Sequence, residues 1–332
     1  MTTGAASKTK PQSAFDLAEG FHLAHALLAF EQHGILSSLT HETTAGSLAK
    51  RHKVDPYILQ AALDLLAART NLIAHRGDKF RLTRQYDAYA RFVIHQYIGA
   101  YGPNAVALDR ILRKPALAGG LVNRRQHAKA FEESPTLSCM LIADLIVQLG
   151  FNDVLDLGCG NGALLADLAG RVSGFRGWGL DFNPAMCAAA KRRLDETAGA
   201  SRVKIFRGDS GQPKVAISPL VRSQVQTLTA ASLANEFFGA GNRLAERWLS
   251  NLRAAFPGRA LLIGDYYGQL GLRRPPRSRA LAMHDFAQVI SGQGVPPPNL
   301  ASWKKIYRSA RCSLIHVVED HEASFFVHLL KL

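Results

Sequence analysis

The sequence predicts a Rossmann-like α/β domain with a doubly wound parallel sheet and an antiparallel edge hairpin, preceded by a mainly helical, winged-helix-like domain. From residue 153 onward, short apolar runs such as VLDLG, GWGLD and ALLIGDYY alternate with helical patterns. Runs that are apolar on both faces are typical of parallel strands covered by helices on both sides. The last two runs, SLIHVVED and SFFVHLLKL, predict the antiparallel hairpin.

The N-terminal region shows the element order of a winged helix-turn-helix. Apolar residues at helical spacing begin near Ser13, and Gly34 marks the end of that helix. A short helix follows over 45–53, and Asp55 with Pro56 gives the N-cap and first position of another helix. The segment NLIAHRGDKFRLT then predicts a β-hairpin that turns at residues 76–78.

These patterns divide the 332 residues into a disordered lead (1–12), a winged-helix-like dimerisation domain (13–118) and a Rossmann-like catalytic domain (119–332). The boundary is placed in the Pro-, Gly- and Arg-containing segment 115–125. With 47% hydrophobic and 20% charged residues, the chain is able to bury a sizeable core. No segment has the apolar length of a secretory signal or a membrane span, so we expect a cytoplasmic protein without a membrane partner.

The formal charge of +14 is unusual and raises the possibility of an anionic partner. Arg273, Arg274 and Arg277 follow the last parallel strand closely, where a carboxylate or phosphate of a substrate would bind. A basic surface without a dedicated ligand is the alternative.

A glycine-rich loop carries the strongest functional signal. Gly158, Gly160 and Gly162 follow the apolar strand that contains Asp156, and a helix starts directly after them. Glycines at this junction allow a sharp turn and let a ligand approach the main chain. The spacing is G-x-G-x-G, and Ala163 breaks the longer pattern of dinucleotide-binding loops.

Acidic residues accompany three successive strands of the predicted sheet. Asp156 lies on the first, Asp181 ends the second, and Asp209 follows the third. Because the carboxyl ends of parallel strands meet at one edge, we expect a common cleft there. Asp181 suits two ribose hydroxyls and Asp209 an adenine amino group, while Asp156 complements a sulfonium with an amino-acid tail. Together these groups predict S-adenosylmethionine as the ligand.

Residues 154–162, 179–181 and 208–209 resemble the first three motifs of class I methyltransferases. The chain from about Phe15 to Leu332 resembles the small-molecule O-methyltransferases of plant and bacterial secondary metabolism. The resemblance implies a methyltransferase that binds S-adenosylmethionine and forms a homodimer through its N-terminal domain. We include Phe182, which follows Asp181, among the cofactor-binding residues.

The sequence departs from this family where the catalytic base is expected. The family's fourth strand usually leads to His-Asp-Trp, whose histidine deprotonates the substrate, whereas this chain has Asn235, Glu236 and Phe237. Asparagine is not a general base at any accessible pH. His284 and Asp285 lie on a helix that in the family roofs the substrate pocket. Asn235, Glu236, His284 and Asp285 are therefore the candidate catalytic residues.

Two mechanisms remain open. Either His284 or Glu236 replaces the missing base, or the protein only positions an acceptor that is already nucleophilic. Some related C-methyltransferases that act on α-keto acids hold a metal with a histidine at each of the two positions. Asn235 lacks one of these ligands, so we predict no metal site and keep a metal-assisted C-methyltransferase as an alternative.

We expect methylation of a small, anionic metabolite on oxygen, nitrogen or carbon. A winged-helix DNA-binding regulator is a competing hypothesis, but the expected recognition helix (56–70) holds Arg69 as its single cation. An RNA or protein methyltransferase is another. The residues after the fourth strand, 235–238, do not match the Asn-Pro-Pro-Tyr-like motif common in those enzymes, so we do not expect a nucleic-acid partner.

Overall fold

A computed structural model describes residues 12–132, 137–271, 278–320 and 324–332 of the chain. The chain forms two compact units, residues 1–99 and 100–332. The boundary predicted from the sequence, after residue 118, lies further along the chain. The segment after Gly99 belongs to the second unit because the buried Asn104 side chain donates hydrogen bonds to the backbone carbonyls of Ala118 (2.7 Å) and Ile290 (2.9 Å). Apart from Gln12, the predicted lead lies outside the described residues, as do Arg273, Arg274 and Arg277.

The first unit contains the predicted order of helices and hairpin. Its elements are α1 (Ala14–Gln32), α2 (Ile35–Ser38), β1 (Thr43–Thr44), α3 (Ala45–His52), α4 (Pro56–Arg69), β2 (Ile73–Arg76), β3 (Lys79–Leu82) and α5 (Ala88–Val93). The three strands form a small antiparallel sheet in the order β1-β3-β2. Asp55 caps α4 by accepting the Ile58 N–H at 2.8 Å, as the sequence predicts. A π-helix, η1 (Ile94–Ala100), follows α5.

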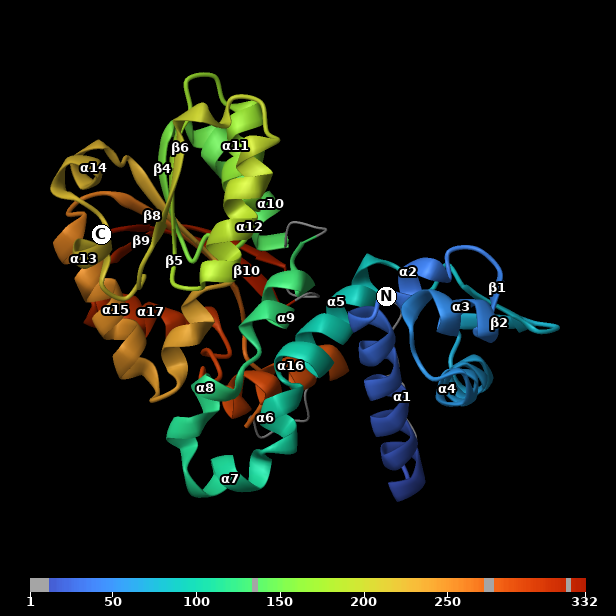
Figure 1. Cartoon of the computed structure of the whole chain (residues 1–332). Helices are drawn as coiled ribbons and strands as arrows, with labels where there is room; N and C mark the ends of the chain where they lie inside the picture. Colours follow the sequence, from blue (N-terminus) through green and yellow to red (C-terminus); the bar gives the residue numbers. More distant parts are fainter. Residues whose placement is uncertain (1–11, 133–136, 272–277, 321–323) are drawn as a thin grey trace, which may run out of the picture. The chain divides into compact units, whose positions relative to one another are not determined.

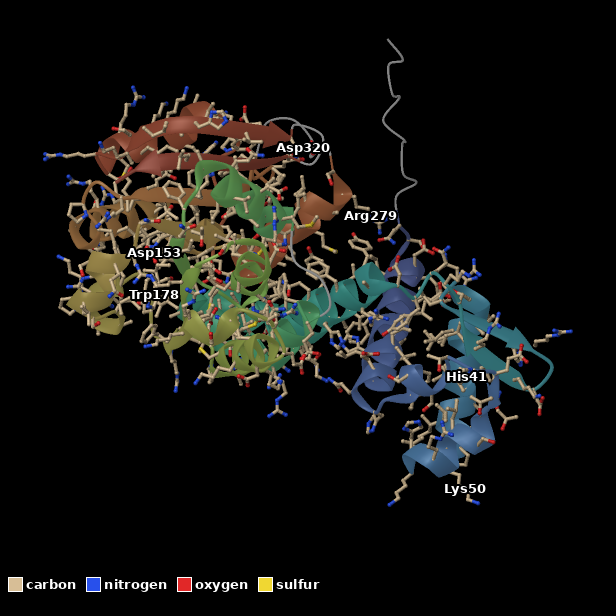
Figure 2. The ribbon with its side chains drawn as sticks, turned by 90° about the horizontal axis from the view of Figure 1, so that it is seen from above. His41, Lys50, Asp153, Trp178, Arg279 and Asp320 are labelled. Carbon is tan, nitrogen blue, oxygen red and sulfur yellow. The ribbon has the colours of Figure 1, made fainter. Side chains whose placement is uncertain are left out.

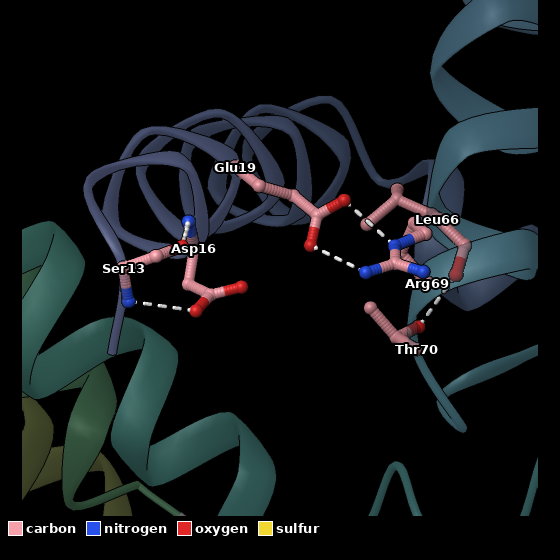
Figure 3. A network of polar contacts seen from close by, with 6 residues as sticks. All are labelled: Ser13, Asp16, Glu19, Leu66, Arg69 and Thr70. Carbon is pink, nitrogen blue, oxygen red and sulfur yellow. Dashed lines mark hydrogen bonds and ion pairs between the residues drawn. The ribbon is translucent and has the colours of Figure 1, made fainter. Parts of the chain in front are cut away.

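Polar contacts cap the start of α1 and join α1 to α4 in this unit. Ser13 and Asp16 form a reciprocal capping box at the start of α1. The Arg69 guanidinium donates to both carboxylate oxygens of Glu19, at 2.6 and 2.9 Å (Figure 3). Arg69 is the only cation on α4, and a DNA-binding helix would need it to contact phosphate. Its bidentate pair with Glu19 leaves α4 without a free cation for that contact.

The second unit is built on a seven-stranded sheet. Its strands are β4 (Asp153–Leu157), β5 (Arg176–Asp181), β6 (Val203–Arg207), β7 (Thr227–Ala231), β8 (Ala260–Tyr266), β9 (Ser313–Asp320) and β10 (Phe325–Lys331). They lie in the order β6-β5-β4-β7-β8-β10-β9. The first five are parallel, whereas β10 runs antiparallel between β8 and β9. The predicted doubly wound sheet with an antiparallel edge hairpin is confirmed.

Helices cover both faces of this sheet (Figure 1), and Figure 2 shows the chain from above with Asp153 of β4 and Trp178 of β5 labelled. One layer contains α10 (Leu137–Leu149), α11 (Ala163–Arg171) and α12 (Pro184–Asp195), and its core includes Ile142, Leu165 and Val154. The other contains α15 (Asn242–Ala255) and α17 (Leu300–Ser309), whose Trp248 and Trp303 pack with Leu155. Because successive residues of β4 contribute to opposite cores, the strand is buried on both sides.

Further helices complete the second unit. They are α6 (Gly102–Val106), α7 (Leu108–Arg113), η2 (Pro115–Leu117), α8 (Ala118–Leu121), α9 (Arg124–Ala130), η3 (Ala200–Arg202), α13 (Pro213–Ala216), α14 (Pro219–Gln224), η4 (Ala234–Phe238) and α16 (Arg279–Ile290). Within the described ranges, no helix combines the length and apolar character that crossing a bilayer requires.

Candidate active site

The glycine loop joins β4 to α11 at the carboxyl edge of the sheet. Gly158, Gly160 and Gly162 all have left-handed φ values, of 62°, 54° and 73°. A Cβ on Gly158 would meet the Leu233 side chain at 2.7 Å, whereas one on Gly160 would meet nothing within 4 Å. Open space therefore faces the main chain at Gly160, where a ligand can lie directly against the backbone.

Asp181 is attached to this loop by its carboxylate. The Gly160 N–H donates to Oδ2 at 2.9 Å and the Asn183 N–H donates to Oδ1 at 2.8 Å. The side chain is only 7% exposed, and burial raises the pKa of the carboxyl while these two N–H groups oppose the rise. Each oxygen keeps further acceptor capacity, which suits a pair of hydroxyl donors.

Arg124 and Phe182 lie next to Asp181, and the sequence analysis missed the arginine. The guanidinium carbon of Arg124 is 4.9 Å from the centre of the Phe182 ring, which is 46% exposed. The backbone carbonyl of Arg124 accepts a hydrogen bond from the Asn183 side chain at 3.3 Å. The sequence placed Arg124 in a linker, but it opens α9, and its capped N-terminus at Asn123 was the available signal.

Asp156 and Asp209 differ sharply in their surroundings. Asp156 is 2% exposed on β4, accepts a hydrogen bond from the Thr229 hydroxyl at 2.6 Å, and has its pKa raised by burial to about 7. Asp209 is exposed, and its carboxylate accepts the Gly211 N–H at 2.7 Å within its own turn. The Gly208 N–H donates to the backbone carbonyl of Asp181 at 2.9 Å, which keeps the two strand ends adjacent.

On the other side of β4, Asn235 and Asp265 meet at the ends of β7 and β8. The buried Asp265 carboxylate accepts the Asn235 N–H at 2.9 Å, and burial raises the pKa of Asp265 to about 7. The Asn235 side-chain oxygen is buried and has no hydrogen-bond partner among the described residues. Such an acceptor is costly to bury alone, so it is available to a donor on a substrate.

Glu236 is half-buried next to Asn235. Its Oε1 accepts a hydrogen bond from the Gln293 amide at 3.1 Å. Burial raises the pKa of Glu236 to about 7, and Arg124 opposes the rise. Gln293 belongs to the turn-rich segment 291–299, where Gly294 lets the chain approach η4: a Cβ there would meet the backbone of Phe238 at 2.3 Å. A carboxylate with a pKa near neutrality is suited to general-base chemistry.

His284 lies on α16, within reach of β8. Its ring contacts the ring of Tyr266 edge-on, with 5.0 Å between centroids, and the Gln288 amide lies 3.2 Å from its Nε2. Burial lowers the pKa of His284 to about 4, so the imidazole is neutral near pH 7 and only weakly basic. Since Tyr266 follows Asp265 directly, the predicted residues Asn235, Glu236 and His284 gather around the ends of β7 and β8.

Asp285 and His127 are also found at this end of the sheet. Asp285 is fully buried, and its Oδ2 accepts the N–H groups of Gln269 (2.6 Å) and Leu270 (2.8 Å), so it ties α16 to the segment after β8. His127 on α9 carries no sequence signal that marks it as a site residue. Burial and the nearby Arg124 and His284 lower its pKa to about 4.

The strand order and the glycine loop define the class I methyltransferase fold, whose enzymes use S-adenosylmethionine as methyl donor. Residues 154–227 match the methyltransferase domain family, so the chain contains an S-adenosylmethionine-dependent methyltransferase domain and is an enzyme of that class. Among the residues that the structure describes, no group of three His, Cys, Asp or Glu side chains is placed to hold a metal ion.

Several solved structures similar to the whole chain are named as O-methyltransferases. The mitomycin 7-O-methyltransferase MmcR is 16% identical, with a TM-score of 0.73 and 96% of each chain covered. An O-methyltransferase family protein from Burkholderia thailandensis is 18% identical, with a TM-score of 0.68, and covers 97% of this chain and 98% of its own. PigF, solved with SAH (S-adenosylhomocysteine), is 15% identical, with a TM-score of 0.73, and covers 98% and 100%. At these identities the similarity establishes a shared fold, and the chain resembles small-molecule O-methyltransferases.

Asp156→Asn tests the balance between stability and cofactor binding. Folding raises the pKa of Asp156 from its ordinary value of 3.8 to about 7. A carboxyl shifted in this direction stabilises the folded state at low pH, and this stabilisation is lost as the pH rises through the folded pKa. At pH 8 the buried charge is therefore unfavourable, and asparagine should raise the free energy of unfolding by about 1 kcal/mol or more, since one pKa unit corresponds to about 1.4 kcal/mol.

Urea denaturation at pH 8 and pH 4 measures the difference in free energy of unfolding between Asp156→Asn and the wild type. This difference should vanish at pH 4. The same variant should bind S-adenosylmethionine less tightly because the negative charge near the glycine loop is lost. A variant that is less stable than the wild type at pH 8 would contradict the assigned ionisation of Asp156.

Proposed function

We propose that the protein transfers a methyl group from S-adenosylmethionine to an oxygen, nitrogen or carbon atom of a small, anionic metabolite of secondary metabolism, without the histidine base usual in this family. The observation that carries the proposal is the hydrogen bond from Gly160 to Asp181 beside open space at Gly160. The names of MmcR and of CalO1, a methyltransferase in calicheamicin biosynthesis, support a secondary-metabolite substrate.

Residues on the β4 and β5 side would hold the cofactor. Asp181 accepts the ribose hydroxyls, Phe182 offers its exposed ring face to the adenine, and the glycine loop leaves room for the methionine end. We assign Asp209 to the adenine amino group through the acceptor capacity that its own turn leaves free. When bound, the cofactor supplies a methyl group activated by a sulfonium, and the buried Asp156 complements that positive charge.

Residues on the β7 and β8 side would hold the acceptor. The Asn235 oxygen receives a donor of the substrate, and Glu236 or His284 accepts the proton released from the acceptor atom. Asp285 and Asp265 position these groups through backbone N–H bonds. Methyl transfer is an in-line displacement at a good electrophile, so orientation contributes a large part of the rate.

Mass spectrometry tests the reaction. The purified protein is incubated with deuteromethyl-labelled S-adenosylmethionine and a panel of phenols, amines and α-keto acids, with and without a carboxylate. Label should appear on a small acceptor and should disappear in Asp181→Ala. Label found only on RNA, or on the amino-acid side chains of an added protein, would overturn the proposal.

We also propose a homodimer formed through the first unit. Apolar side chains are exposed there on α1 (Phe15, 72%; Phe21, 52%) and on α4 (Tyr57, 83%; Ile58, 69%). Large apolar side chains exposed on two neighbouring helices favour an interaction surface on this unit.

Sedimentation equilibrium of Ile58→Glu measures the effect on association. A charge buried in an apolar interface should shift the protein from dimer to monomer, whereas Arg81→Glu on the exposed hairpin should leave the dimer intact. A wild-type protein that is monomeric at micromolar concentration would disprove the dimer.

A further inference from the structure

The layer formed by α15 and α17 presents a strongly basic surface. Its exposed cations, here called the basic face, are Arg243, Arg247, Lys304, Lys305, Arg308 and Arg311. Arg243 and Arg247 share one side of α15, and Lys304 and Arg308 share one side of α17, because residues four apart lie on the same side of a helix. Glu246 is the single acidic residue of α15, and α17 has none.

The structure gives these cations no internal role. None of the six side chains forms an ion pair with another residue in the described ranges. Both helices are fixed in place by buried aromatic residues, since Trp248 stacks on Phe237 at 4.6 Å and Trp303 is fully buried. A rigid surface with unpaired charges of one sign attracts an anionic partner.

Both helices begin beside the acceptor side of the site. The chain passes from η4, which carries Asn235 and Glu236, into α15. It also passes from Gln293, which is hydrogen-bonded to Glu236, into α17. With a rise of 1.5 Å per residue, the helices extend about 15 to 20 Å away from these starting points. A partner seated on the basic face would therefore be within reach of the site by a flexible arm of similar length.

We propose that the basic face docks an acidic protein that carries the methyl acceptor on a flexible arm, so that the substrate arrives tethered. This inference rests on the proposed function and specifies how its substrate is delivered. A second copy of this chain is disfavoured as the occupant because a symmetric contact would bring the unpaired cations of two basic faces together. Single-stranded nucleic acid is disfavoured because the aromatic residues of α15 and α17 are buried and offer no stacking platform.

The test uses an acidic acyl carrier protein that bears a phosphopantetheine arm as the probe. Isothermal titration at 50 mM salt should show binding to the wild type, and 200 mM salt should weaken it because the contact is electrostatic. Arg247→Glu with Arg308→Glu should raise Kd at least tenfold. Lys191→Glu with Arg192→Glu is the matched control: it makes the same charge change on α12, in the other helical layer, and should alter Kd less than twofold.

Three outcomes would overturn the proposal. The first is that the wild type does not bind the carrier protein, and the second is that both double variants weaken this binding equally. The third is that a DNA duplex binds more tightly than the carrier protein and that its binding is lost in Arg247→Glu with Arg308→Glu. Titration of every variant with SAH keeps the two proposals distinguishable, because docking can fail while cofactor binding remains. A wild-type protein that does not bind SAH would instead disprove the proposed function.

Discussion

Replacing Asp181 by alanine should weaken the binding of SAH by about a hundredfold or more. The carboxylate is expected to accept both ribose hydroxyls, and hydrogen bonds to a charged group contribute about 1.5–3 kcal/mol each. The substitution also releases the Gly160 N–H, so the glycine loop loses an internal constraint. A loss of about 2.7 kcal/mol corresponds to a hundredfold change in Kd.

Isothermal titration calorimetry measures this change directly. Asp195→Ala, at the exposed end of α12, makes the same substitution away from the glycine loop and should leave Kd unchanged. Circular dichroism must show that both variants are folded. Wild-type affinity in a folded Asp181→Ala protein would contradict the assignment of the ribose site.

Replacing Glu236 by glutamine should lower kcat more than tenfold if Glu236 is the general base. The pKa of Glu236 is raised by burial to about 7, and a base acts only when deprotonated. The wild-type rate should therefore rise with pH and level off above about 7, and glutamine should abolish this dependence while preserving the shape of the side chain. His284→Ala should also lower kcat more than tenfold, but His284, with a pKa of about 4, does not titrate in this range.

Rates measured between pH 5.5 and 9 separate the two bases. If the pH dependence of the rate disappears only in Glu236→Gln, Glu236 is the general base. If kcat falls strongly only in His284→Ala, His284 is the base. Unchanged turnover in both variants would show that the enzyme relies on positioning. Glu196→Gln, which makes the same substitution at an exposed position at the end of α12, serves as the control.

Regular patterns made most of the fold predictable. The alternation of apolar runs with helices, the cap formed by Asp55 and the glycine spacing after β4 are all local signals, and the structure contains each of them. The division after Gly99 has no local signal, because Asn104 joins segments far apart in sequence through backbone carbonyls.

The site was only partly predictable for the same reason. Asp181 and Glu236 follow strands, so topology places them at the sheet edge. Arg124, His127 and Gln293 come from helices and loops whose positions depend on tertiary packing. The burial that raises the pKa of Glu236 is likewise a property of the folded chain.

Calorimetric titration of the wild-type protein with SAH, and separately with NADH, tests the central claim most directly. We expect SAH to bind with one molecule per chain and NADH to give no heat of binding, because the glycine loop has the G-x-G-x-G spacing and faces open space at Gly160. Binding of NADH, or no binding of SAH, would contradict the assignment of this protein as a methyltransferase.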